Sequence, residues 1–351
     1  MGDKKINESW RFRRGITAAI AIAAALMMQA PSSVGAADLV TVKVANPTAL
    51  LHLPYYVAIE QGFFKKQGLE IENITTFNWV PAVLSGDVDF ATASPDALVI
   101  GASKGKPVPS IVTEQQTNSI TLLASTTLKL PNLAKGYPEY LRDLKGASIG
   151  VPNLGTGNES FIRQSFTQIG FENGRDYSMV AMGANANILN ALRAHKTEAA
   201  TLIPPFTELA ISEKSGVALT SEPKGEGPET NAKGVGTNIV VNPAYAKAHP
   251  DVVKKFIAAI VEADAYVRDT DKNMERLAEI VAKYQTGVSI KAIDEQGIRT
   301  IASLAYPGVS CKSWQLVAQG LMTIGAVPAI PKCEDMIALD VAPKGPLGPG
   351  K

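Results

Sequence analysis

The sequence predicts an α/β fold built from two similar lobes. Two observations carry this prediction. Short apolar stretches with strand character alternate with segments of helical character, which is typical of an α/β domain. A comparable strand–loop–helix unit returns near residue 147, and two units built alike indicate two lobes.

The first unit begins with a valine-rich strand at residues 40–45, followed by a loop and a helix that starts near Pro54. Proline is well suited to the first position of a helix, and Gly62 suits the helix end. A second strand is expected at residues 69–74. The chain therefore opens with strand, loop, helix and strand.

The same order continues along the chain. A buried strand at 87–93 leads to Ser94, which is predicted to cap a helix with Pro95 at its first position. The second unit has a strand at 147–151, and a glycine-rich loop at 152–157 leads into the next helix. Amphipathic helices are then expected at residues 252–267, 273–284, 290–302 and 313–324.

The composition of the 351 residues fits one large or two medium domains. The chain is 46% hydrophobic and 19% charged, which supports a substantial core and argues against disorder. Because the formal net charge is only +1, bulk electrostatics gives no reason to expect a nucleic-acid partner.

The first residues are predicted to be a signal peptide. Basic residues precede an apolar run at 16–28, and small residues follow it. We expect residues 1–36 to be removed, with cleavage after Ala36 or Ala37. The alternative is an uncleaved membrane anchor, although this run is short for a bilayer span. The mature protein is therefore expected to be exported.

Export bears on the two cysteines, Cys311 and Cys333. In an oxidising compartment such a pair is expected to form a disulfide, worth about 3 kcal/mol in the chain-entropy view. The rival interpretation, a catalytic thiol, needs a histidine partner that the sequence alone does not place.

Five motifs give the chain a family resemblance. They are LPYYVAIEQGFFKKQGLEIE at 53–72, LSGDVDFATAS at 84–94, GKPV at 105–108, DLKGASIGV at 143–151 and NPAYAKAHPDVVKKFIAAI at 242–260. In this order they resemble the nitrate/sulfonate/taurine-type solute-binding proteins of ABC importers, which have the type II periplasmic-binding-protein fold. The motifs are specific to the family and not to a ligand.

The resemblance implies two Rossmann-like α/β lobes joined by two hinge strands near 121–125 and 237–241. The first lobe would hold residues 38–122 and 239–345, with the C-terminal helices as an extension, and the second would hold 123–238. Residues 346–351 would be a flexible tail. A periplasmic monomer that closes around its ligand is implied, with an ABC permease of the inner membrane as partner and no cofactor.

In open α/β sheets, ligands bind beyond the carboxyl ends of the strands, where helix N-termini favour anions. The loops that meet this condition supply the residues expected to bind the ligand, which are His52, Asn78, Trp79, Ser94, Gly155, Thr156, Gly157 and Asn185.

Three of these residues have a second interpretation. Thr156 and Glu159 fit a capping box that touches no ligand. Trp79 suits stacking on a ligand, but equally the core of a lobe. His52 suits donation to an anion, but equally the cap of the helix that starts at Pro54.

The ligand class follows from what these loops contain. They have no arginine, and Arg163 lies about two turns into its helix, whereas a doubly charged anion is often held by a guanidinium. A singly charged or partly apolar ligand is therefore expected, either a sulfonate or an aromatic carboxylate of the phthalate or benzoate type. The alternatives are a pyrimidine thiamine precursor, nitrate or bicarbonate, or a sensor role at a membrane receptor.

An enzymatic function is the competing class, because the resemblance extends to a thiamine-pyrimidine synthase. Its run of three cysteines is absent here. The three histidines and two distant cysteines give neither metal-ligand spacing nor a nucleophile elbow. We therefore expect that the protein is not an enzyme and that it has neither catalytic residues nor a metal site.

Overall fold

A computed structural model of the chain describes residues 39–46, 49–74, 76, 79–284 and 291–344. The expected signal peptide and C-terminal tail lie outside these residues, as does Asn78. Within the described ranges, no helix combines the length and the apolar character that a bilayer span requires.

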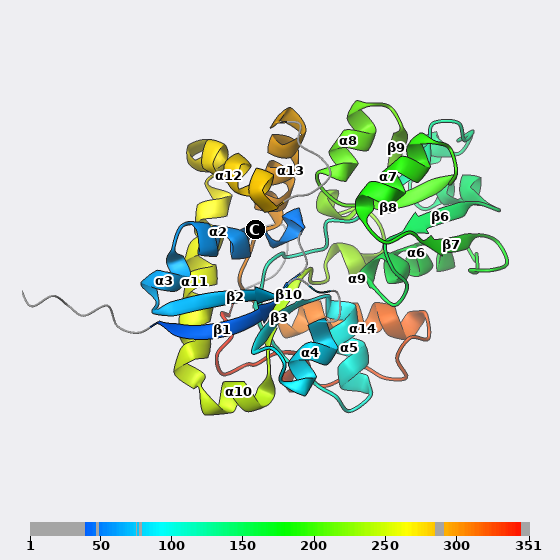
Figure 1. Cartoon of the computed structure of the whole chain (residues 1–351). Helices are drawn as coiled ribbons and strands as arrows, with labels where there is room; N and C mark the ends of the chain where they lie inside the picture. Colours follow the sequence, from blue (N-terminus) through cyan, green and yellow to red (C-terminus); the bar gives the residue numbers. More distant parts are fainter. Residues whose placement is uncertain (1–38, 47–48, 75, 77–78, 285–290, 345–351) are drawn as a thin grey trace, which may run out of the picture. The chain divides into compact units, whose positions relative to one another are not determined.

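The described residues form two five-stranded sheets (Figure 1). The first has the order β2-β1-β3-β10-β4, and its strands are β1 (Val40–Ala45), β2 (Leu69–Ile74), β3 (Phe90–Ala93), β4 (Ser110–Thr113) and β10 (Asn238–Val241). The second has the order β7-β6-β8-β5-β9, and its strands are β5 (Thr121–Ser125), β6 (Ser148–Val151), β7 (Ser178–Ala181), β8 (Ala199–Leu202) and β9 (Gly216–Ser221).

Both sheets are mixed in the same way. Strand β1 pairs in parallel with β2 and β3, whereas β10 runs antiparallel to β3 and β4. In the second sheet β6 pairs in parallel with β7 and β8, whereas β5 runs antiparallel to β8 and β9. In each sheet the antiparallel strand is the one that the chain forms on arriving from the other sheet. The predicted α/β fold of two lobes is confirmed.

Two segments connect the sheets, which we call the outgoing crossing (residues 114–120) and the return crossing (222–237). They run side by side, because Glu114 N donates to Thr237 O at 2.8 Å and Gly236 N donates to Gln115 O at 3.0 Å. Strand β5 begins at Thr121 within the second sheet and β10 at Asn238 within the first. The lobe boundaries at 122/123 and 238/239 stay predictions.

Each sheet is covered by helices on both faces, so its strands are apolar on both sides. In the first sheet, Val42 and Val44 face one core and Ala45 faces another, as the two-residue period of a strand requires. The helices of the first lobe are η1 (Leu50–His52), α2 (Leu53–Glu60), α3 (Phe63–Lys66), α4 (Trp79–Ser85) and α5 (Pro95–Ser103).

The second lobe repeats this arrangement, with Leu122 in one core and Leu123 in the other. Its helices, together with those of the return crossing, are η2 (Leu133–Lys135), η3 (Glu139–Leu144), α6 (Gly157–Thr167), α7 (Asn185–Arg193), α8 (Phe206–Ser212), η4 (Glu222–Lys224) and α9 (Glu229–Ala232).

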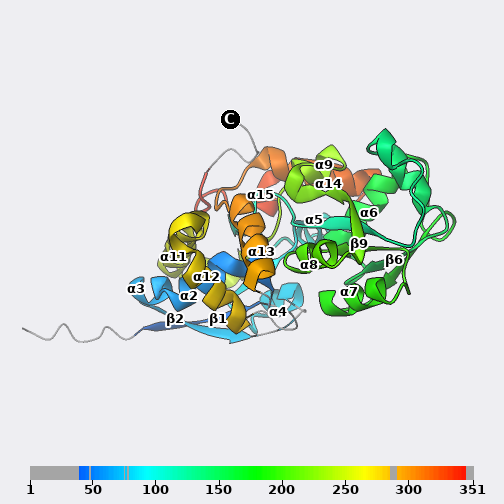
Figure 2. The ribbon, with the colours of Figure 1, turned by 90° about the horizontal axis from the view of Figure 1, so that it is seen from above.

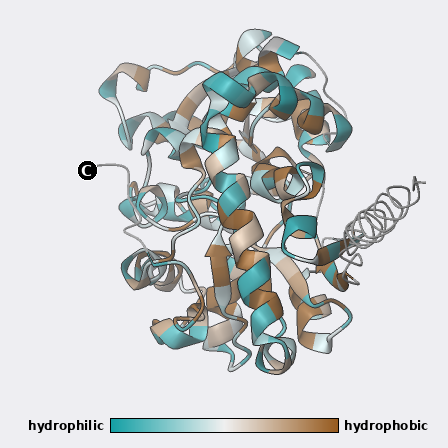
Figure 3. Ribbon diagram, turned by 90° about the vertical axis from the view of Figure 1, so that its left-hand side faces the viewer, coloured by the Kyte–Doolittle hydropathy of each residue, from teal (hydrophilic) through white to brown (hydrophobic). Residues whose placement is uncertain are grey.

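The C-terminal region is helical, as expected. Its helices are α10 (Pro243–Ala248), α11 (Pro250–Arg268), α12 (Thr270–Tyr284), α13 (Lys291–Leu304), α14 (Cys311–Thr323) and α15 (Cys333–Met336). Hydrophobic and hydrophilic residues alternate along α11, the long helix that faces the viewer in Figure 3. Its apolar face packs on the first lobe, where Phe256 stacks on Phe90 with ring centroids 4.1 Å apart.

This extension also reaches the second lobe. Ile293 of α13 belongs to the core formed by Phe206 and Leu209 of α8, and the views in Figures 1 and 2 place α13 beside α8. The expected disulfide is present between Cys311, which opens α14, and Cys333, which opens α15, with Cα atoms 5.6 Å apart.

Candidate functional site

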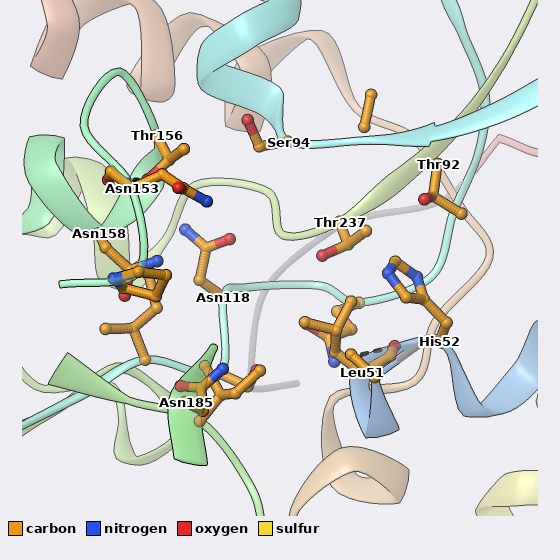
Figure 4. Close-up of a pocket in the computed structure, with 18 of the residues that line it drawn as sticks. Leu51, His52, Thr92, Ser94, Asn118, Asn153, Thr156, Asn158, Asn185 and Thr237 are labelled. Carbon is orange, nitrogen blue, oxygen red and sulfur yellow. Dashed lines mark hydrogen bonds between the residues drawn. The ribbon is translucent and has the colours of Figure 1, made fainter. Parts of the chain in front are cut away.

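A cavity of about 170 Å³ lies between residues of the first lobe, loops and helix starts of the second lobe, and both crossings. A water molecule needs at least ~10–15 Å³ on this measure, so the cavity has room for on the order of ten. It is lined by Ala49, Leu51, His52, Trp79, Thr92, Ala93, Ser94, Gln115, Asn118, Ser119, Ile120, Pro152, Asn153, Thr156, Gly157, Asn158, Asn185, Ile203 and Thr237 (Figure 4).

Six of the eight residues that the sequence predicts to bind the ligand line this cavity. These six are His52, Trp79, Ser94, Thr156, Gly157 and Asn185. Gly155 does not line this cavity, and it borders a smaller one of about 70 Å³ that also contacts Thr156. Asn78 lies outside the described residues, so its position is not tested.

Three helices begin at the cavity wall, where Ser94 and Thr156 are the N-cap residues of α5 and α6 and Asn185 is the first residue of α7. His52 lies at the start of α2, but this helix continues directly from η1, so Leu53 N donates to Leu50 O and Pro54 has no N–H. The first amides of a helix lack intrahelical partners and carry the positive end of its dipole. The wall therefore offers donors to an electronegative group of a ligand.

At two of these helix starts, side-chain hydrogen bonds determine the local structure. Ser94 caps α5 as expected, because its hydroxyl accepts a hydrogen bond from Ala97 N at 3.3 Å. The capping box expected at Thr156 is wrong. The Thr156 hydroxyl donates instead to Asn153 O at 3.0 Å, and Glu159 Oε2 accepts from Gly155 N at 2.7 Å. In a capping box Glu159 would accept from the backbone N–H of Thr156. Here it accepts from the backbone N–H of Gly155, one residue earlier.

His52 occupies the other end of the cavity, near Thr92 and Thr237 (Figure 4). It occupies the N-cap position of α2, but its side chain makes no capping hydrogen bond. Its Nδ1 lies 2.8 Å from Glu114 Oε2, and both side chains are buried. This contact holds the imidazole ring in one orientation.

Trp79 opens α4 and is half-buried. It packs against the core on one face of the first sheet and also lines the cavity. The interpretation of Trp79 as part of the lobe core is confirmed, and its contact with a ligand stays a prediction.

The sequence did not nominate the outgoing crossing, which contributes Gln115, Asn118, Ser119 and Ile120 to the cavity. Gln115 is buried, and its Nε2 donates to Leu51 O at 3.4 Å. These residues follow a strand that leads to no helix, so the rule that relies on helix starts misses them. The signal that could have found them is a polar run, QQTNS at 115–119, between two apolar strands.

Three amide groups at the cavity wall retain bonding capacity. The buried oxygens of Gln115, Asn158 and Asn185 accept no hydrogen bond from the described residues. An Asn or Gln amide presents its NH₂ group instead after a half-turn about its last side-chain bond. The amides of Asn158 and Asn185 can therefore either donate to a ligand oxygen or accept from a ligand N–H, whereas Gln115, whose Nε2 donates to Leu51 O, can accept.

The cavity lining contains no lysine or arginine. Arg163 lies at the neighbouring smaller cavity, where its Nη2 donates to Ile324 O at 2.6 Å. This agrees with the expectation that it lies too far along its helix to hold the ligand. Among the described residues, no cluster of His, Cys, Asp and Glu side chains could hold a metal ion.

Two α/β lobes that enclose a cavity between paired crossings define the type II periplasmic-binding-protein class of fold. Within it, the chain belongs to the NMT1/THI5-like family, whose sequence profile matches residues 50–273.

Individual relatives are more distant. The riboflavin-binding protein RibY of Chloroflexus aurantiacus is 24% identical over 251 residues, and the putative binding protein YtlA of Bacillus subtilis is 27% identical over 243 residues. Each match covers 66% of this chain, but only 62% of RibY and 67% of YtlA.

A solved structure gives the same fold. The alkanesulfonate-binding protein SsuA of Xanthomonas axonopodis pv. citri, bound to MOPS, has a TM-score of 0.66 and 16% identity, covering 86% of this chain and 99% of SsuA. All three relatives are named as binding proteins, in agreement with the expectation that this chain is not an enzyme.

Proposed function

We propose that this protein is the solute-binding component of an ABC importer and captures a small organic anion in the cavity between its lobes. The observation that carries the proposal is the set of three helix starts, at Ser94, Thr156 and Asn185, that open on one cavity. Such ends bind anions through their amides without a basic side chain.

A singly charged head group fits this wall better than a doubly charged one. No lysine or arginine lines the cavity, so only amides, hydroxyls and the His52 ring are available to balance charge. A sulfonate or a carboxylate satisfies this condition. The apolar side chains of Leu51, Trp79 and Ile203 line the same cavity and suit the hydrocarbon part of the solute.

A second candidate is an uncharged heterocycle with alternating N–H and C=O groups. Two observations favour it. The amide groups of Asn158 and Asn185 can donate or accept, and the Gln115 oxygen can accept. The chain is also similar to a riboflavin-binding protein.

Capture requires the lobes to separate and close. In this proposal, residues 38–122 with 239–345 move against residues 123–238, and the two crossings act as the hinge. In this proposal the signal peptide predicted at residues 1–36 directs export to the periplasm, where the protein acts as a monomer. The closed form is what an inner-membrane permease would receive.

The test is thermal unfolding of the purified protein with a panel of alkyl and aryl sulfonates, benzoates, phthalates, nitrate, bicarbonate, pyrimidines and riboflavin. A ligand at about 100 times its dissociation constant stabilises the folded state by roughly 2.7 kcal/mol. We expect a sulfonate or an aromatic carboxylate to raise the unfolding temperature most. A shift from riboflavin or a pyrimidine alone would replace the anion proposal with the second candidate.

A further inference from the structure

The lobes also meet behind the cavity, at a buried carboxyl group. Asp96 lies near the start of α5, and its Oδ1 accepts a hydrogen bond from the Ser160 hydroxyl, near the start of α6. Because α5 lies in the first lobe and α6 in the second, this bond joins the lobes. It lies directly under the cavity wall, since a Cβ on Gly157 would come within 3.2 Å of Asp96 Oδ2.

A second buried carboxyl lies beside this contact. Glu222 begins the return crossing and is fully buried, and its backbone N donates to Ile120 O at 3.0 Å. Neither carboxyl oxygen of Glu222 accepts a hydrogen bond of good distance and angle from the described residues. The side-chain amides of Asn118 and Asn231 lie close to it. The outgoing crossing, the return crossing and both lobes therefore converge on two acidic groups.

Burial favours the protonated form of both groups. The pKa of Glu222 is raised to about 8, chiefly by burial and also by the neighbouring Asp96 charge, while hydrogen bonds from Asn118, Asn231 and the backbone act against this rise. Burial also raises the pKa of Asp96, against the lowering effect of the Ser160 hydrogen bond. Two carboxylates taken out of water together are costly, so the protonated forms are favoured.

No cation offsets these carboxyl groups. The ion pairs between described residues do not include Asp96 or Glu222. On α6, Arg163 pairs with Glu159 at 3.4 Å and bonds to a backbone carbonyl. Lys224 and Glu226, beside Glu222 in the chain, are exposed to water.

A second lobe–lobe contact has the same chemistry. Thr300 of α13, in the C-terminal extension of the first lobe, donates its hydroxyl to Glu208 Oε1 of α8 at 2.9 Å. Burial raises the pKa of Glu208 as well. Asp294, also on α13, is buried and its pKa is raised for the same reason. Acidic groups are thus removed from water at both of these lobe–lobe contacts.

We propose that closing of the lobes takes up protons, because Asp96 and Glu222 are uncharged in the lobe–lobe contact and ionise when separation hydrates them. This inference rests on the proposed lobe movement but not on any class of ligand. A group with a raised pKa in the closed form favours closure at low pH. That advantage is lost as the pH rises from the ordinary carboxyl range toward the pKa in the closed form.

The test is small-angle X-ray scattering of the ligand-free protein at about pH 6 and about pH 9, on either side of the pKa of Glu222. We expect the radius of gyration of the wild type to increase at the higher pH. The double variant Asp96→Asn/Glu222→Gln keeps the shape of both side chains without a titrating proton, so it should stay compact at both values. Glu229→Gln, an exposed carboxyl on the same crossing, should expand like the wild type.

A wild type with the same radius at both pH values would overturn the inference, as would a double variant that expands equally. Circular dichroism establishes that each variant is folded, and Glu222→Gln alone, which should show a reduced expansion, decides the question if the double variant does not fold. Neither outcome decides the proposed function. The ligand panel is measured at a single pH, so it can identify a ligand even when the scattering shows no pH-dependent expansion.

Discussion

At the scale of single residues, the cavity depends on polar side chains that hold one another in place. His52 would be free to turn on its own, but the Glu114 carboxyl, 62 positions away in sequence, holds its ring. Thr156 is held by Asn153 in the same way. A site with few charged contacts gains its affinity from such preorganisation, because less order is lost when the ligand arrives.

Removal of the Glu114 carboxyl should be costly. Glu114→Ala leaves the buried His52 ring without an acceptor, and we expect a loss of about 2–4 kcal/mol in the free energy of unfolding. Glu114→Gln keeps an acceptor oxygen and should retain most of the stability. Urea unfolding measures both. Glu139→Ala, which breaks an exposed pair with Arg142, should cost under about 1 kcal/mol, and an equal loss in both alanine variants would refute the assignment.

Thr156→Val should weaken solute binding while it preserves the fold. The substitution removes one hydroxyl at the cavity wall, together with its bond to Asn153. A single hydrogen bond is worth about 0.5–1.5 kcal/mol, so a threefold to tenfold weaker affinity is expected. Thr167→Val, at the exposed far end of the same helix, serves as the control in calorimetric titration with the solute found in the panel. Equal affinities of the two variants would show that Thr156 makes no contact.

At the scale of elements, the paired crossings are closely packed and tolerate little change at Gly236. Gly236 packs against the backbone of the outgoing crossing, where a Cβ would come within 2.4 Å of Thr117 O and 2.7 Å of Thr117 C. Backbone atoms cannot turn aside as a flexible side chain can. The two crossings could not then keep their present hydrogen bonds.

Gly236→Ala is therefore expected to cost about 1–3 kcal/mol in the free energy of unfolding, as overpacking does, and to weaken solute binding as well. Urea unfolding and calorimetric titration give the two readings. Lys233→Ala, an exposed neighbour on the return crossing, should change neither. A fully stable Gly236→Ala variant would mean that the crossings are not as closely packed as described.

The bond between Cys311 and Cys333 joins α14 to α15 on the first lobe. A thiol assay of the denatured, non-reduced protein should detect no free thiol. Reduction should lower the free energy of unfolding by about 3 kcal/mol, the chain-entropy value for a loop of this length. Two reactive thiols in the denatured protein would contradict the bond.

The elements were also the part that the sequence predicted best. Caps and stops have a local cause, as at Ser94, whose hydroxyl accepts from Ala97 N. The cavity was predicted only where a helix begins. Gln115 and Asn118 reach the cavity because two crossings lie side by side, and Asp96 meets Ser160 across the lobes. Those contacts join distant parts of the chain and leave no local pattern.

At the scale of the whole molecule, the account makes one central claim, that a small solute is held between the two lobes. Each lobe contributes helix starts to the cavity, at Ser94 in the first and at Thr156 and Asn185 in the second. Neither lobe alone encloses the solute, so binding and closure are one event in this account.

The most direct test is a crystal structure of the complex with the panel compound that raises the unfolding temperature most. The account predicts electron density for the compound within the cavity, in contact with Thr156 and Asn185 from one lobe and with Ser94 or His52 from the other. Density that lies outside the cavity, or against one lobe only, would contradict it.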